Sequence, residues 1–144
     1  MSTSPLPAAR GTELPGQHAA DLSAVRADAR GRGELTVLVD DVRSFRDGRP
    51  CLVSRSSAAG VKLLQRLAGT RIDHLWLDHD LVGDDTIWPV VRHLETAWET
   101  GQPYDIGLVH LHAASSRAEH RMGITLRRAE YRTERPVDLE LWTR

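Results

Sequence analysis

The sequence lacks three features that would restrict where a protein works. It contains one cysteine, Cys51, so no disulfide can form within the chain. Its longest apolar runs are far too short to cross a bilayer, and residues 1–16 contain no apolar core of the signal-peptide type. These absences predict a cytoplasmic protein without a membrane segment.

Charge of one sign is also scarce. The formal net charge is −1, so overall electrostatics predict no strong attraction to nucleic acid, and the sequence shows no DNA-binding motif. The basic residues are almost all arginine, because Lys62 is the only lysine. Any site whose chemistry requires a lysine therefore has only this one to use.

The length of 144 residues suits one domain that can bury a core without a disulfide or structural metal. Residues 1–33 are rich in Ala, Gly, Pro, Ser and Arg and have few large apolar side chains. Such a segment buries too little surface to offset the entropy of ordering, so we expect a flexible tail. Apolar side chains at helical spacing predict a short helix near residues 19–29, and the folded domain is expected over residues 34–144.

Short apolar runs after the tail predict strands. Four of them stand at residues 35–39, 51–54, 74–77 and 106–112. Near the end of the chain, Val137, Leu139 and Leu141 alternate with polar residues, which predicts a short edge strand.

Amphipathic stretches between these runs predict three helices. The first begins at Ser56 or Ser57, and the second covers about residues 87–101. The third begins at Ser116, which has capping-box spacing to Glu119.

Alternating strands and helices imply an α/β fold, with a mainly parallel sheet and right-handed crossovers. We predict a three-layer sandwich with strand order about 2-1-3-4(-5). Only about eleven residues separate the first two strands, close to the minimum for a parallel crossover. Whether the second strand is parallel is therefore left open.

Polar residues stand at the carboxyl ends of three predicted strands. They are Asp40 and Asp41 after the first strand, Asp78, His79 and Asp80 after the third, and His112 at the end of the fourth. In an open α/β sheet, ligands bind beyond these ends, near the switch in strand order. We therefore expect the three strand ends to converge on one acidic and histidine-containing pocket.

Carboxylates in a small volume repel one another unless a cation or protons intervene. All-oxygen ligation suits Mg²⁺ or Mn²⁺, so the sequence predicts a divalent cation between Asp40, Asp41 and Asp78. The planar guanidinium group of Arg43 is suited to binding phosphate oxygens. His112 is a histidine, whose usual pKa suits proton transfer near neutral pH.

Simpler interpretations stay open beside this one. Asp40 and Asp41 are also what a strand end and a following turn commonly contain. Residues 78–80 also fit a solvated loop, in which His79 braces the backbone instead of contacting a ligand.

Three blocks of the sequence resemble one known family. Residues 39–43 read Val-Asp-Asp-Val-Arg, residues 77–81 read Leu-Asp-His-Asp-Leu, and His112 is followed by Met122 at the family's spacing. Over roughly residues 35–130, the chain resembles the cyclic-phosphate processing receiver-like domains, a divergent branch of the response-regulator receiver fold. The resemblance implies a receiver-like, flavodoxin-like α/β sandwich.

The resemblance also implies a function: a metal-dependent phosphoesterase that processes cyclic phosphates of nucleotides or RNA ends with Mg²⁺ or Mn²⁺. The residues it implies are His112, Asp78, Asp80 and His79 for catalysis, Arg43 and Ser115 for the phosphate, and Asp40, Asp41 and Asp78 for the metal. A covalent variant of this chemistry uses Asp78 as the nucleophile.

The chain departs from the family pattern after the fourth strand. Ala113, Ser115 and Ser116 stand where the family has a hydroxyl residue, Asn and Pro. The alternative is therefore a non-catalytic receiver-like module that binds a nucleotide or metal, or acts through a protein partner. Because Lys62 lies within a predicted helix, the lysine of a phosphoacceptor receiver is lacking, and ordinary two-component phosphotransfer is disfavoured.

Overall fold

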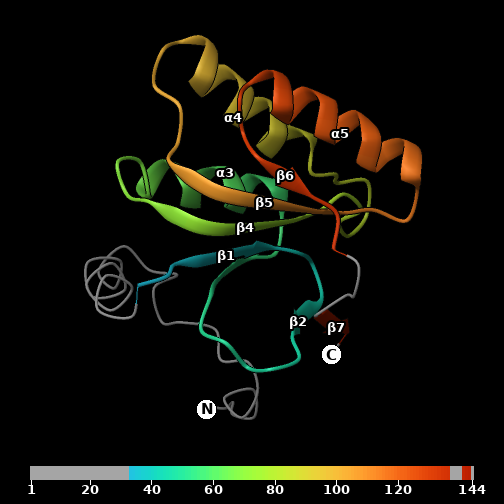
Figure 1. The fold of residues 1–144 in the computed structure, drawn as a ribbon. Helices are drawn as coiled ribbons and strands as arrows, with labels where there is room; N and C mark the ends of the chain where they lie inside the picture. The colour runs from blue at the N-terminus through green and yellow to red at the C-terminus, as the bar shows by residue number, and fades with distance from the viewer. Residues whose placement is uncertain (1–32, 137–140, 144) are drawn as a thin grey trace.

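The computed structural model describes residues 33–136 and 141–143. Five strands form one parallel sheet in the order β3-β1-β4-β5-β6. Figure 1 labels β1, β4, β5 and β6 of this sheet. The five strands are β1 (Thr36–Val39), β3 (Leu52–Ser54), β4 (Ile72–Asp78), β5 (Ile106–His112) and β6 (Thr133–Glu134). This confirms the predicted strand order and the α/β receiver-like fold. The short link between β1 and β3 does join parallel neighbours.

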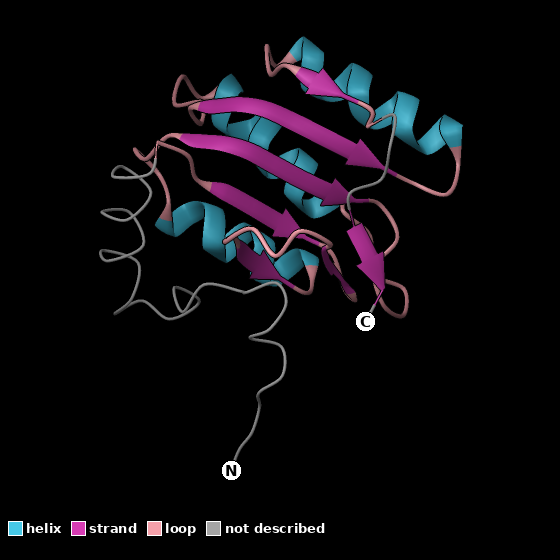
Figure 2. Cartoon of the chain, turned by 60° about the horizontal axis from the view of Figure 1, so that its bottom comes forward, coloured by secondary structure: helices cyan, strands magenta, loops and turns pink. Residues whose placement is uncertain are grey.

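Three helices cover one face of the sheet (Figure 2). They are α3 (Ser57–Arg66), α4 (Trp88–Glu99) and α5 (Ser116–Arg128). The strands send Val39, Leu77 and Leu111 into the core beneath these helices. Successive side chains of a strand point to opposite faces, so the polar residue that follows each of them is directed to the other face.

The face opposite the helices carries a two-stranded ribbon. Here β2 (Arg43–Phe45) pairs antiparallel with β7 (Leu141–Thr143). The ribbon and this face of the sheet share a second apolar cluster, formed by Leu38, Phe45, Cys51, Val53, Trp76 and Leu141. A second helical layer, expected of a three-layer sandwich, is not among residues 33–136 and 141–143.

The C-terminal strand differs from its prediction. The fifth strand of the parallel sheet is β6, which the sequence pattern did not reveal. Leu141 does begin a strand, but this strand belongs to the separate ribbon, and Val137 and Leu139 lie outside the described residues. An alternating pattern reports that one face of a strand is buried, but it does not identify the partner strand.

The first residues of α3 and α5 decide between the two predicted caps of α3 and correct the predicted cap of α5. Ser56 is the N-cap of α3, since its side chain accepts a hydrogen bond from a backbone N–H of the first turn. In α5 the N-cap is Ser115, so the predicted capping box from Ser116 to Glu119 is wrong by one residue. The Glu119 carboxylate instead accepts a hydrogen bond from the Ala113 N–H at 3.1 Å.

The predicted tail over residues 1–33, with its short helix near residues 19–29, lies outside the described residues except for residue 33. The first described strand, β1, falls within the predicted run at residues 35–39. Within the described ranges, no helix is long and apolar enough to span a bilayer.

Candidate functional site

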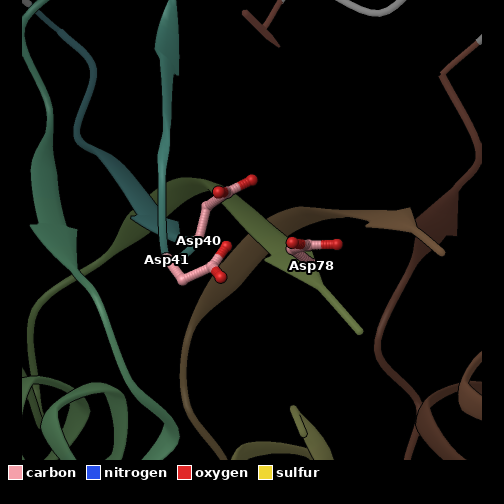
Figure 3. Close-up of side chains that lie close together, drawn as sticks. All are labelled: Asp40, Asp41 and Asp78. Atoms are coloured by element: carbon pink, nitrogen blue, oxygen red, sulfur yellow. The ribbon is translucent and has the colours of Figure 1, made fainter. Parts of the chain in front are cut away.

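Three carboxylates meet at the carboxyl edge of the sheet (Figure 3). Asp40 and Asp41 follow the last residue of β1, and Asp78 is the last residue of β4, the neighbouring strand. One oxygen from each residue lies within 4.8 Å of the other two. Asp40 is 0% exposed and Asp78 is 6% exposed. The structure therefore brings the three predicted metal ligands together, and we call them the acidic cluster.

The Asp40 carboxylate is held by the turn that it starts. Its Oδ1 accepts hydrogen bonds from the N–H groups of Val42 at 3.0 Å and Arg43 at 2.8 Å. Its Oδ2 is buried and has no hydrogen-bond partner among the described residues. A buried carboxylate oxygen without a partner is costly, so this atom has room for a ligand that the described residues do not supply.

Burial and mutual repulsion make the charged form of the acidic cluster unfavourable. Burial raises the pKa of Asp78 to about 7, and the negative charge of Asp40 adds to the effect. Burial also raises the pKa of Asp40, against the hydrogen bond from the Arg43 backbone. Two adjacent buried carboxylates therefore require either protons or a cation near neutral pH.

A divalent cation fits these residues. The donors are all carboxylate oxygens, the ligand type that Mg²⁺ and Mn²⁺ prefer. Asp40 Oδ2, which accepts no hydrogen bond from the described residues, would be free to contact the cation. Such an ion would offset the repulsion between Asp40 and Asp78.

Arg43 begins β2 beside the acidic cluster. Burial raises the pKa values of Asp40 and Asp78, and the positive charge of Arg43 opposes this rise. The same charge adds to the effect of burial in lowering the pKa of His112, so the guanidinium lies near all three groups. Its Nη1 is buried without a hydrogen-bond partner among the described residues. The arginine that the sequence predicts for phosphate binding thus has a buried donor that no described residue accepts.

A second arginine, Arg55, was missed at the sequence level. Its Nη1 donates to the backbone carbonyl oxygens of Asp40 at 3.1 Å and Arg43 at 2.7 Å. The two bonds tie the turn of the acidic cluster to the end of β3. Arg55 directly follows that strand, so the rule that selected polar residues after strands one, three and four would also have found it after strand two.

His112 ends β5 and pairs in register with Asp78 on β4. Its carbonyl oxygen accepts a hydrogen bond from the His79 N–H at 2.9 Å, which joins the end of β5 to the residue after β4. Burial lowers the pKa of the His112 imidazole, and the charge of Arg43 lowers it further, against the carboxylates of Glu119, Asp40 and Asp80. His112 is therefore mostly neutral at pH 7, the state in which an imidazole accepts a proton.

Comparison with known families agrees with this geometry. A family model described as the cyclic-phosphate processing receiver domain matches residues 35–128. The chain belongs to this family. The match runs from β1 to the last residue of α5 and includes the acidic cluster. Neither a curated protein nor a solved structure matches the chain.

In this cyclic-phosphate processing receiver domain, His79 and Asp80 form a pair beside the acidic cluster. His79 Nδ1 lies 2.9 Å from Asp80 Oδ1, and this bond lowers the pKa of Asp80. Asp80 Oδ2 also accepts a long hydrogen bond of 3.4 Å from the Ala114 N–H. The pair therefore connects the loops after β4 and β5, which agrees with the bracing interpretation of His79.

In the receiver domain, Ser115 stands directly before a helix, whereas Lys62 lies inside one. The Ser115 hydroxyl caps α5 by accepting a hydrogen bond from the Ala118 N–H at 3.3 Å. Lys62 lies within α3. As the only lysine of the chain, it leaves the ends of β5 and β6 without one.

Proposed function

We propose that the protein is a metal-dependent phosphoesterase that opens cyclic phosphates on nucleotides or RNA ends. The observation that carries this proposal is the acidic cluster, in which three carboxylates converge and a buried oxygen of Asp40 has no partner in the described chain. Membership of the cyclic-phosphate processing family supports the substrate class.

Asp40, Asp41 and Asp78 are the residues that would hold Mg²⁺ or Mn²⁺. A divalent cation bound there supplies positive charge for the phosphate oxygens and lowers the pKa of bound water. The raised pKa of Asp78 adds a requirement, because this carboxyl must lose its proton before it can ligate.

The proton transfers fall to His112. In its neutral form it accepts a proton from the water that attacks phosphorus, as the new P–O bond forms. The P–O bond to one ribose oxygen then breaks, and the His112 imidazolium returns the proton to that oxygen. Arg43 donates to the non-bridging oxygens, whose negative charge grows during attack.

The remaining predicted residues position this machinery. The His79–Asp80 pair holds the loops after β4 and β5 at a fixed separation. Ser115 presents its hydroxyl at the start of α5, on the loop that follows His112. Ala113 stands where the family has a hydroxyl residue, and it is buried. Its side chain has no hydrogen-bonding group, and its backbone N–H already donates a hydrogen bond to the Glu119 carboxylate.

The test is hydrolysis of a 2′,3′-cyclic nucleotide by purified protein, with Mg²⁺ or Mn²⁺ and with EDTA. We expect ring opening only with metal, a loss of at least about 100-fold in Asp78→Asn, and a loss of about 100- to 10,000-fold in His112→Gln. Asp84→Asn, on an exposed loop residue, is the matched control and retains activity. If calorimetry detects binding of metal and cyclic nucleotide but no bond is cleaved, the non-catalytic alternative replaces this proposal.

A further inference from the structure

The peptide group between His112 and Ala113 is hydrogen-bonded on both sides. Its carbonyl oxygen accepts a hydrogen bond from the His79 N–H at 2.9 Å. Its N–H donates to Oε2 of Glu119 at 3.1 Å. The first bond comes from the residue after β4, and the second comes from the first turn of α5. Groups from two different elements therefore set the orientation of this peptide plane.

The orientation of this peptide plane affects where the His112 side chain points. A peptide group is rigid, so a rotation of the plane changes the ψ angle of His112. The rotamers that a side chain can adopt depend on the φ and ψ angles of its own residue. A contact that fixes the plane therefore also restricts the imidazole, which is the proposed proton-transfer group.

The position of Glu119 is not explained by the stability of its own helix. Glu119 lies in the first turn of α5, where the helix dipole favours a negative charge. An exposed carboxylate would serve that purpose, but the Glu119 side chain is only 10% accessible. In a capping box the carboxylate bonds to the N-cap N–H, which here belongs to Ser115. Glu119 instead bonds two residues further back, at the N–H beside His112.

Arg135 contacts the Glu119 carboxylate from the end of the neighbouring strand. It directly follows β6, which pairs in parallel with β5, and its Nε lies 2.9 Å from Oε1 of Glu119. This oxygen is buried and has no aligned hydrogen-bond donor among the described residues, so the ion pair with Arg135 is what offsets its charge. Arg135 lies beyond the family match, which ends at residue 128. The family pattern therefore does not include it.

The electrostatics of His112 agree with a nearby Glu119 carboxylate. Burial lowers the pKa of His112, and the charge of Arg43 lowers it further. Among the carboxylates that oppose this shift, Glu119 has a larger effect than Asp40 or Asp80. Glu119 thus lies close to the imidazole as well as to the peptide group that follows it.

We propose that Glu119 is a positioning residue for His112, and that Arg135 acts through Glu119. Glu119 and the His79 N–H together fix the peptide plane that follows His112, so that the imidazole keeps one orientation at the end of β5. Arg135 keeps the Glu119 carboxylate in place. Neither Glu119 nor Arg135 has to contact the substrate. This inference rests on the proposed function and adds two residues to it.

The first test uses NMR of the full chain without substrate. It measures hydrogen exchange of the Ala113 amide and the side-chain couplings that report the χ1 rotamer of His112. We expect Glu119→Ala to speed the exchange by at least about tenfold and to replace a single His112 rotamer by an average of several. Glu119→Gln keeps both wild-type readings, because the amide oxygen can accept the same N–H while the exposed Arg135 turns away.

The second test is steady-state opening of a 2′,3′-cyclic nucleotide in saturating Mn²⁺. We expect Glu119→Ala to lower kcat by about 10- to 100-fold, as for a displaced reacting group, with little change in KM because no substrate contact is removed. Glu119→Gln restores most of the rate. Arg135→Ala lowers kcat less, and it has no further effect in the Glu119→Ala background because it acts through Glu119. Arg132→Ala, which removes an exposed arginine just before β6, is the matched control and changes neither quantity.

Two results would overturn the inference. If Glu119→Ala lowers only the melting temperature and leaves the His112 rotamer and kcat unchanged, Glu119 has a purely structural role. If Glu119→Gln is as impaired as Glu119→Ala, Glu119 acts through its charge and not through its hydrogen bond. The two proposals can be judged separately. The expected NMR changes in a protein that opens no cyclic phosphate contradict only the phosphoesterase, whereas an active enzyme that tolerates Glu119→Ala contradicts only the positioning role.

Discussion

At the scale of single residues, Asp78 shows how a binding site opposes stability. Its carboxylate is buried against Asp40, and its pKa is raised from 3.8 to about 7. The folded state therefore holds a proton that the unfolded state releases near pH 4. The stability of the metal-free protein falls as pH rises through this window, because folding then requires either proton uptake or a buried charge.

Removal of this charge should stabilise the metal-free protein. In EDTA at pH 8, we expect Asp78→Asn to raise the free energy of unfolding by on the order of 2 kcal/mol, about half of what the full pKa shift would give in a dry site. At pH 4 the gain disappears, since Asp78 is then protonated in the folded state. Urea unfolding at the two pH values measures the difference, and an equal effect at both would show that the Asp78 charge carries no penalty.

At the scale of secondary-structure elements, the loop between β4 and α4 is tied to a different helix. The Asp85 carboxylate accepts hydrogen bonds from the N–H of Ser57 at 2.8 Å and from its hydroxyl. Burial alone raises the pKa of Asp85, but these bonds outweigh it and lower the pKa below its usual range. The loop that carries His79 and Asp80 is thereby anchored to the first turn of α3, where a negative charge is favourable.

The loss of this anchor should destabilise the fold in a pH-dependent way. We expect Asp85→Ala to lower the free energy of unfolding by about 1–2 kcal/mol at pH 7. A carboxylate with a depressed pKa stabilises above the unfolded pKa near 4, so the deficit shrinks as pH falls through the folded pKa. Thermal unfolding at pH 7 and pH 3 provides the measurement. The adjacent exposed Asp84→Ala is the control, and an equal loss in both variants would contradict the anchor.

At the scale of the whole molecule, the proposed metal site would link cation binding to folding. The turn at Asp40 and Asp41 and the end of β4 meet only in the folded chain, so a cation bound by the acidic cluster would stabilise the native state alone. A cation at 100 times its dissociation constant adds about 2.7 kcal/mol.

The melting temperature should therefore depend on the cation. With saturating Mn²⁺ or Mg²⁺, we expect a rise of roughly 10 °C at neutral pH, and most of this rise should be lost in Asp78→Asn. Differential scanning calorimetry with and without EDTA checks this linkage. A wild-type melting temperature that is insensitive to both metals would argue against a cation at the acidic cluster.

The sequence alone supported much of the fold and site because both follow from local rules. Continuous apolar runs mark buried parallel strands, and the carboxyl ends of such strands meet at one edge of the sheet. Asp40, Asp41, Asp78 and His112 could therefore be selected from residues that are far apart along the chain. The same rule, applied to the end of the second strand, would also have selected Arg55.

Only the tertiary structure decided which strands and side chains pair with each other. The pairing of β2 with β7, the place of β6 in the parallel sheet and the bonds from Arg55 to the turn at Asp40 all depend on contacts between distant segments. The pattern of apolar residues along the sequence predicts which side chains are buried, but it does not identify the residues that pack against them. Burial depends on a single residue, whereas a contact depends on two residues that can be far apart in the sequence.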